Sequence, residues 1–344
     1  MQSDRRRLNP PSGGTAPPVF ATVPDAKPQR PTRTRKPDEH RKLFLRTGIV
    51  PSASGSAYYE IPPQQQQQTG LLVPQRSSLK ITCTVHGPRP LPRNAAFSPN
   101  LLLSAHVKFA PFATHNRRGY VRDASERDLG AHLETALRGV VIGERFPKSG
   151  CEVVLTILEG EEDGWGAGGT EVKGGGWGIM TVLAGCITAA SAALVDAGID
   201  CVDLISGGVA AVKYAGRHGG QEDGVVVLDP APSEHDGEIM AACVVGYLQS
   251  RDEVTEMWMK GDAGTQVQTL IDEAVKAASL VRAVLAEAVK DGVQAKVGEA
   301  EDEAAMAGSA KEGKGKSKEV VMTGRCSGIY EAGHLDDLLV RTPF

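Results

Sequence analysis

One stretch of the chain, Gly174–Gly198, is small or apolar at almost every position and carries a charge only at Asp196. A helix that is apolar around its whole circumference is normally buried on all sides, so this stretch predicts the central helix of the fold. Its apolar run Ile179–Val195 lies at the short limit for a membrane span and lacks an aromatic belt. We interpret it as a core helix and expect no membrane partner.

Apolar and polar positions alternate from Leu79 to Val85, which is typical of a half-buried strand that ends at Gly87-Pro88. A second strand over 101–112 is expected to pair with it. Short apolar runs between turn residues predict the remaining strands, which cover residues 151–160, 202–214, 224–230, 238–249 and 253–261.

Two further helices are predicted beside the central one. Asp123 followed by Glu126 is typical of a capping box, and the apolar residues over 129–140 follow at helical spacing. The last helix covers 264–292, and Gly292 is a reasonable C-terminal stop. Strands and helices in this order predict an α+β fold, in which helices pack on a mixed sheet within one domain.

Several segments lack a periodic pattern and are expected either to flank the packed domain at residues 38–292 or to form loops within it. Residues 1–37 carry eight prolines and a large excess of Arg and Lys, which predicts a disordered basic arm. The others are a low-complexity loop at 62–70 with the polyglutamine run 64–68, a Gly-rich acidic loop at 160–176, a disordered insertion at 293–319 and a short C-terminal helical segment at 320–344.

The net charge of −4 gives no overall basic excess of the kind that would indicate a nucleic-acid-binding domain. Basic residues do cluster near 5–7 and 33–36, which is compatible with nuclear import. The cysteines at 83, 151, 186, 201, 243 and 326 lack the spacing of zinc ligands. We therefore expect buried, reduced thiols and no metal or other cofactor.

Four features, in order over about residues 38–292, resemble the RNase PH family. They are RTGIVPSASGSAYYEI before a strand ending VHGPRPLPR, the strand, capped helix and strand over 101–160, a Gly-Gly start to a small-residue helix ending ALVDAGI, and VDLISGGVAAV followed by VVLDP. The resemblance implies a ribosomal protein S5 domain 2-like fold, with a mixed sheet and packed helices, and assembly in rings of six.

Active members of that family degrade RNA from the 3′ end by phosphorolysis. The resemblance implies that an arginine and the helix N-terminus hold the phosphate, while an aspartate pair serves acid catalysis or metal binding. This chain has Trp177-Gly178 where Thr-Arg is expected, and His235 and Ala241 at the aspartate positions. A shift of register by one residue still leaves only one acid. No basic residue lies between Lys173 and Lys213, so we expect a catalytically inactive site.

An inactive site and a basic arm resemble the non-catalytic RNase PH-like ring subunits of the eukaryotic RNA exosome. The implied partners are other RNase PH-like subunits in a six-subunit ring, S1/KH-type cap subunits and RNA bound without sequence specificity. The implied function is support of 3′-to-5′ RNA processing, rRNA maturation and RNA turnover in the nucleus, nucleolus and cytoplasm. Two alternatives remain, namely an active phosphate-dependent 3′ exoribonuclease and an RNA-binding module that works alone through its arm.

Five arginines are candidate RNA contacts, because they lie in loops at strand ends or just before the first predicted helix. They are Arg89, Arg93, Arg117, Arg118 and Arg122. Guanidinium groups there would bind phosphates without reading sequence. A solvated surface or ion pairs between subunits are the alternative. Trp177 offers either a stacking surface for a base or, as we favour, a plug for a hydrophobic gap.

Overall fold

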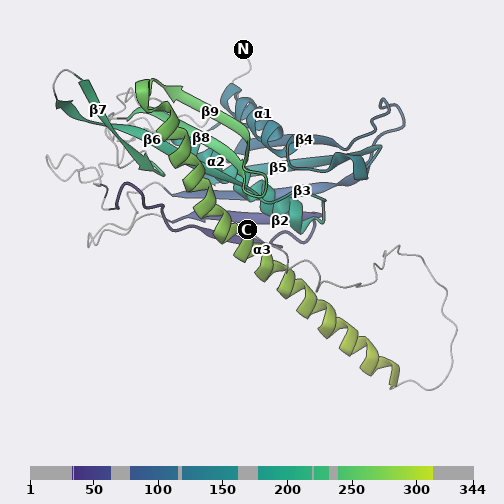
Figure 1. Ribbon diagram of the computed structural model, residues 1–344. Helices are drawn as coiled ribbons and strands as arrows, with labels where there is room; N and C mark the ends of the chain where they lie inside the picture. Colours follow the sequence, from purple (N-terminus) through teal and green to yellow (C-terminus); the bar gives the residue numbers. More distant parts are fainter. Residues whose placement is uncertain are drawn as a thin grey trace, which may run out of the picture. The chain divides into compact units, whose positions relative to one another are not determined.

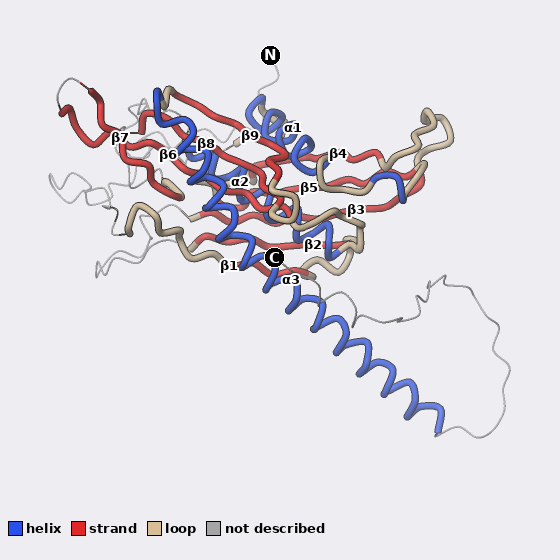
Figure 2. Tube along the Cα trace, viewed as in Figure 1, coloured by secondary structure: helices blue, strands red, loops and turns tan. Residues whose placement is uncertain are grey.

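The protein is described from a computed structural model, which describes residues 33, 35–62, 78–114, 118–161, 177–218, 221–231 and 239–312 (Figures 1 and 2). The chain divides into two units, residues 1–295 and 296–344. In chain order the elements are β1 (Phe44–Thr47), β2 (Gly55–Ile61), β3 (Leu79–Pro90), β4 (Leu102–Phe109), α1 (Ala124–Arg138), η1 (Gly143–Arg145), β5 (Ser149–Glu159), α2 (Gly178–Asp196), β6 (Ile205–His218), β7 (Gln221–Leu228), β8 (Ile239–Leu248), β9 (Glu253–Gly261), η3 (Gly264–Gln266) and α3 (Val267–Glu312).

The strands form two sheets, one in the order β1-β2-β3-β5-β4 and one in the order β7-β6-β8-β9. All neighbouring strands are antiparallel except β4 and β5, which are parallel and are joined by α1 as a crossover. The predicted pairing of the strand at 101–112 with the strand at 79–85 was wrong, because β5 lies between them. The predicted end at Gly87-Pro88 was also wrong, since β3 continues to Pro90 after a register shift.

Helix α2 lies between the two sheets and contacts strands of both (Figure 1). Nearly all of its residues are buried, and the prediction of a central helix is confirmed. Among the described residues it is the one helix long and apolar enough to cross a membrane, but 89% of that stretch is buried inside the protein. The small-residue composition therefore serves the core.

The helices divide the first unit into layers around two cores. The first core lies between the sheets and includes residues of α1 and α2. The second core lies where the other face of the β6–β8 sheet meets the first part of α3. The five-stranded sheet buries one face on α2 and leaves the other half-exposed, with polar side chains such as Thr82, Thr84 and His106 along it.

Two successive glycines of β6 allow helices to approach the sheet from opposite sides. A Cβ on Gly207 would lie 2.3 Å from the carbonyl oxygen of Ala184 in α2. A Cβ on Gly208 would lie 2.2 Å from the carbonyl oxygen of Ala274 in α3. The backbone of β6 therefore contacts the backbone of α2 on one face and that of α3 on the other. No side chain larger than hydrogen fits at either glycine.

The other sheet meets α2 through the Gly-Ser-Ala turn that begins β2. A Cβ on Gly55 would lie 2.3 Å from the backbone nitrogen of Ala197, and Ser56 donates its N–H to the Asp196 carboxylate at 2.8 Å. The one charged residue of the helix is thus the acceptor for this turn. Two motifs that are far apart in the sequence form a single contact.

Helix α1 begins with the predicted capping box, in which Glu126 accepts a hydrogen bond from the N–H of Asp123 at 2.9 Å. The same carboxylate is buried and also accepts from the N–H of Phe109 and from Lys108 Nζ. Burial would raise the pKa of Glu126, but these donors outweigh it and lower the pKa. The cap therefore also fastens the start of α1 to the end of β4.

Helix α3 continues to Glu312, so the predicted stop at Gly292 was wrong. A Cβ on Gly292 would lie 2.0 Å from Thr47 Oγ1, which shows that the glycine allows β1 to approach the helix. Alanine, glutamate and lysine are frequent over 293–312, and these residues favour helix. The expected insertion is therefore helical up to Glu312, while the polyglutamine loop, most of the acidic loop and the segment 313–344 lie outside the described residues.

We predict that Gly207→Ala or Gly208→Ala destabilises the fold by about 1–3 kcal/mol, because the added methyl group forces α2 or α3 away from β6. Urea denaturation of the purified chain measures the free energy of unfolding. Gly119→Ala is the matched control, because nothing lies within 4 Å of a Cβ at Gly119. Equal stability of Gly207→Ala and the unaltered chain would contradict the close approach.

Candidate functional site

Trp177 lies at the head of α2, where an anion would meet a buried helix. It takes the N-cap position with helical backbone angles and makes no side-chain cap. Lys260 Nζ lies 5.6 Å from its ring centroid, and a Cβ on Gly261 would come within 3.0 Å of the ring. Trp177 therefore packs against the end of β9, which favours the hydrophobic plug over the stacking surface.

Among the described residues, the other positions where the chain departs from the family pattern add no catalytic group. Gly178 is the first residue of α2 and is buried. Ala241 is fully buried on β8 and pairs with Gly261. His235 lies outside the described residues, so the interpretation of this position stays a prediction.

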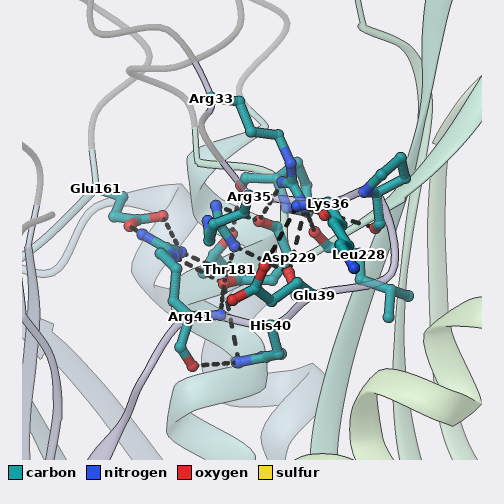
Figure 3. Close-up of polar contacts among 12 residues, drawn as sticks. Arg33, Arg35, Lys36, Glu39, His40, Arg41, Glu161, Thr181, Leu228 and Asp229 are labelled. Carbon is teal, nitrogen blue, oxygen red and sulfur yellow. Dashed lines mark hydrogen bonds and ion pairs between the residues drawn. The ribbon is translucent and has the colours of Figure 1, made fainter.

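An arginine is linked to the first turn of α2, although none lies near it in the sequence. Arg41 precedes β1 and binds Asp229, directly after β7. The next residue, Pro230, accepts a hydrogen bond from Thr181 Oγ1 in the first turn of α2 at 3.5 Å (Figure 3). A buried cation thus binds the turn that contacts this helix, and it comes from before β1 rather than from the stretch between Lys173 and Lys213.

The guanidinium of Arg41 is paired with two carboxylates. Its Nε and Nη2 donate to Asp229 at 2.7 and 2.8 Å, and its Nη1 and Nη2 donate to Glu161, Nη2 at 3.2 Å. The N–H of Arg41 adds a further bond to Asp229 at 3.0 Å. The side chains of Arg41, Asp229 and Glu161 are 4%, 2% and 0% exposed, respectively. We call Arg41, Asp229 and Glu161 the buried ion cluster.

Two more arginines from the segment before β1 bind the same turn. Arg33 Nη2 donates to the carbonyl oxygen of Leu228 at 3.0 Å, and Arg35 Nη1 donates to the Asp229 carboxylate at 3.3 Å. The final part of the expected free arm is thus folded against the end of β7 (Figure 3). The packed domain begins before residue 38.

Charge holds the cluster in its ionised form. Burial by itself would raise the pKa of Asp229, but the charges of Arg41, His40 and Arg35 outweigh it and hold this pKa well below its ordinary value. Burial by itself would lower the pKa of Arg41, but the two carboxylates outweigh it and raise this pKa well above its ordinary value. A carboxylate with so low a pKa does not donate a proton at neutral pH. A guanidinium held on two sides by carboxylates has no pair of N–H groups left to bind a phosphate.

The described cysteines offer no alternative nucleophile. Burial raises the pKa of Cys151 and Cys243 to about 11 and that of Cys201 to about 12. Burial raises the pKa of Cys83 and Cys186 as well. Because the thiolate is the reactive form, none of these thiols is activated near neutral pH.

Two of the candidate RNA-binding arginines each contact a histidine on the half-exposed face of the five-stranded sheet. Arg122 Nη1 lies 2.8 Å from His106 Nδ1 on β4, and Arg89 Nη2 lies 3.2 Å from His86 Nδ1 on β3. Glu152 on β5 lies between these strands, directly opposite His86 in the register, with Oε1 3.6 Å from His106 Nε2. We call these five residues the sheet-face cluster.

The two histidines connect the arginines to the strands. A guanidinium can only donate, so a hydrogen bond from Arg89 or Arg122 needs an accepting Nδ1 on His86 or His106. Arg89 and Arg122 each use one N–H here and are exposed, so both can also bind an anion in solution.

The remaining candidate arginines lie nearby or outside the described residues. Arg118, four residues before Arg122, stacks 4.6 Å from the centroid of the Phe109 ring and lies 3.5 Å from the Asp123 carboxylate. Arg93 is exposed in the loop after β3. Arg117 lies outside the described residues, and its proposed contact with RNA stays a prediction.

The sequence alone did not identify either cluster. Strand alternation could have placed His86 and His106 on the outward face, but only the strand order brings them to either side of Glu152. The buried ion cluster left no local signal, because Arg41 and Asp229 are 188 residues apart.

Comparison with known proteins shows the family of this chain. Residues 39–200 match the RNase_PH family, described as "3′ exoribonuclease family, domain 1". The chain is 49% identical over 278 residues to the exosome complex component MTR3 of Chaetomium thermophilum, which covers 80% of this chain and 92% of that protein. The chain belongs to the RNase PH family. The predicted resemblance is confirmed.

Other members of the RNase PH family support the assignment. The exosome complex component mtr3 of Schizosaccharomyces pombe is 29% identical over 296 residues, covering 82% of this chain and 94% of that protein. Among solved structures, rice Rrp46 matches with a TM-score of 0.55 and 17% identity over 75% of this chain and 98% of that chain. This likeness confirms the α+β RNase PH fold. The opening over 41–48 and the departures at Trp177-Gly178 favour the mRNA transport regulator subunit, and the two MTR3 relatives agree.

We predict that Asp229→Asn destabilises the fold by about 3–5 kcal/mol at neutral pH, because it removes one of the two carboxylates that neutralise the buried Arg41. Since the folded pKa of Asp229 is lowered, its contribution is complete above the unfolded pKa near 3.9 and is lost as pH falls below about 4. Urea denaturation at several pH values measures both effects.

The control is Asp200→Asn, which removes a half-exposed ion pair with Arg145 and should cost less than about 1 kcal/mol. The difference in the free energy of unfolding between the unaltered chain and Asp229→Asn should become smaller in acid. A difference that stays constant from neutral pH to below about pH 4 would contradict the ionic role of Asp229.

Proposed function

We propose that this chain is a non-catalytic structural subunit of the six-subunit exosome ring, which supports 3′-to-5′ RNA processing and degradation by forming part of the RNA-threading channel. Membership in the complex is supported by the 49% identity to a protein named exosome complex component MTR3 over 92% of its length. The tasks of such a ring are rRNA maturation and RNA turnover in the nucleus, nucleolus and cytoplasm.

The observation that carries the loss of catalysis is the pairing of the Arg41 guanidinium. Phosphorolysis needs a cation that is free to position a phosphate, and the buried ion cluster pairs its cation with two acids. Neither acid is available as a proton donor while it neutralises Arg41. Trp177 at the N-cap of α2 and Ala241 on β8 supply no replacement.

The partners follow from the same membership. They are other RNase PH-like subunits on either side in the ring, S1/KH-type subunits that cap it, and RNA bound without sequence specificity. The sheet-face cluster supports the RNA contact, because Arg89 and Arg122 are exposed and each retains guanidinium N–H groups for phosphates. The chain needs no cofactor for this role.

The first test of this proposal is an assay for phosphorolysis. The purified chain, incubated with single-stranded RNA and inorganic phosphate, should release no nucleoside diphosphate and should leave the RNA at full length. An RNase PH-family enzyme that is active under the same conditions is the positive control. Shortening of the RNA from its 3′ end with release of nucleoside diphosphates would replace the proposal by an active exoribonuclease.

The second test concerns the RNA contact. Arg89→Ala combined with Arg122→Ala should weaken RNA binding to a similar extent for all sequences. The salt dependence of log K should become shallower by about 0.7 for each phosphate of a single strand that the protein no longer neutralises. Fluorescence anisotropy with labelled RNA at several salt concentrations measures both quantities.

The control for this test is Arg145→Ala, which changes an exposed arginine that pairs with Asp200 away from the sheet-face cluster. It should leave the affinity and the salt slope unchanged. An unchanged slope for the Arg89/Arg122 double variant would remove the sheet face from the proposed RNA path.

A further inference from the structure

We infer that Tyr120, between Arg118 and Arg122, is a stacking platform for a base of single-stranded RNA. The inference rests on the proposed function and specifies the form of RNA that this part of the surface binds. The Tyr120 side chain lies in the loop between β4 and α1 and is 90% exposed.

The loop holds Tyr120 outward because its backbone is fastened on the other side. Lys108 Nζ on β4 donates to the carbonyl oxygens of Gly119 and Val121 at 2.9 and 3.1 Å. The same ammonium group binds the buried Glu126 carboxylate at 2.9 Å. The carbonyl groups of both neighbours of Tyr120 are thus tied to the sheet, so the ring is presented to solvent by a fixed backbone.

Both flanking arginines are also held in place. Arg118 stacks on the Phe109 ring and faces Asp123, and its N–H donates to the carbonyl oxygen of Pro111 at 3.2 Å. Arg122 is held by His106. A fixed side chain loses less conformational entropy on binding. These arginines are therefore preorganised to bind the phosphates on either side of a base that stacks on Tyr120.

An aromatic ring between two arginines fits single-stranded nucleic acid. Bases stack on exposed aromatic rings and the guanidinium groups follow the phosphates, and this mode tolerates any sequence because every base has a π-face. In a duplex the base faces are covered by their neighbours. A Tyr120 platform therefore selects single strands over duplex, while the arginines alone bind both.

The experiment compares RNA binding by full-length variants, with labelled oligoadenylate as the single strand and the same strand annealed to oligouridylate as the duplex. Tyr120→Ala should weaken binding of the single strand by roughly 5- to 150-fold, with little change for the duplex. The slope of log K against log salt should stay the same, because the arginines still neutralise the same phosphates. Tyr120→Phe keeps the ring and should retain the affinity.

The matched control is Val121→Ala, which shortens the neighbouring exposed side chain and should change the affinity by less than about twofold. Thermal melting should be the same for all three variants, since both residues are exposed. An equal loss of affinity for single strand and duplex, or a loss below about twofold for Tyr120→Ala, would overturn the platform.

The outcome also separates this inference from the proposed function. If the Arg89/Arg122 double variant loses affinity and salt dependence while Tyr120→Ala binds normally, the RNA path stands and the platform is wrong. If Tyr120→Ala binds RNA normally but no longer assembles with RNase PH-like partners, Tyr120 is a protein contact and the platform is wrong as well. If single-strand affinity falls only in the Tyr120→Ala variant, the platform is supported while the sheet-face path is not.

Discussion

The close approach of α2 to both sheets is the constraint on which the rest of the fold depends. Gly207 on one sheet and Gly55 on the other have no room for a Cβ against the helix backbone. Where the backbones approach, α2 carries small residues such as Ala184 and Ala193, while large side chains such as Ile187 fill the core elsewhere along the helix. Its hydroxyl groups are used in the same contact, since Thr188 Oγ1 accepts from the N–H of Gly207 and Ser191 Oγ from that of Ile205.

The buried ion cluster shows how the fold accommodates charge in its interior. A buried guanidinium is costly unless it is paired and hydrogen-bonded, and Arg41 satisfies this with Asp229 and Glu161. The pairing makes the charges structural, because the same contacts that stabilise them exclude an incoming anion. Exposed arginines such as Arg89 and Arg122 differ, because their remaining N–H groups face solvent rather than acids.

The sequence predicted what depends on local pattern. The central helix, the capping box at Asp123 and the strands β3–β9 were visible from period, cap and turn residues. What it could not predict depends on tertiary pairing. The insertion of β5 beside β3, the contact of Gly292 with Thr47 and the pairing of Arg41 with Asp229 each join distant segments. A glycine that permits close approach also looks the same in sequence as one that ends a helix.

The distance in sequence between Arg41 and Asp229 has a consequence for how the chain is made. A ribosome delivers Arg41 early; Glu161 follows 120 residues later and Asp229, directly after β7, 188 residues later. Until Asp229 is made, Arg41 lacks one of its two counter-ions, and burial of the segment before β1 is costly. Closure of this segment is therefore a late step of biogenesis, completed only when about two thirds of the polypeptide has been synthesised.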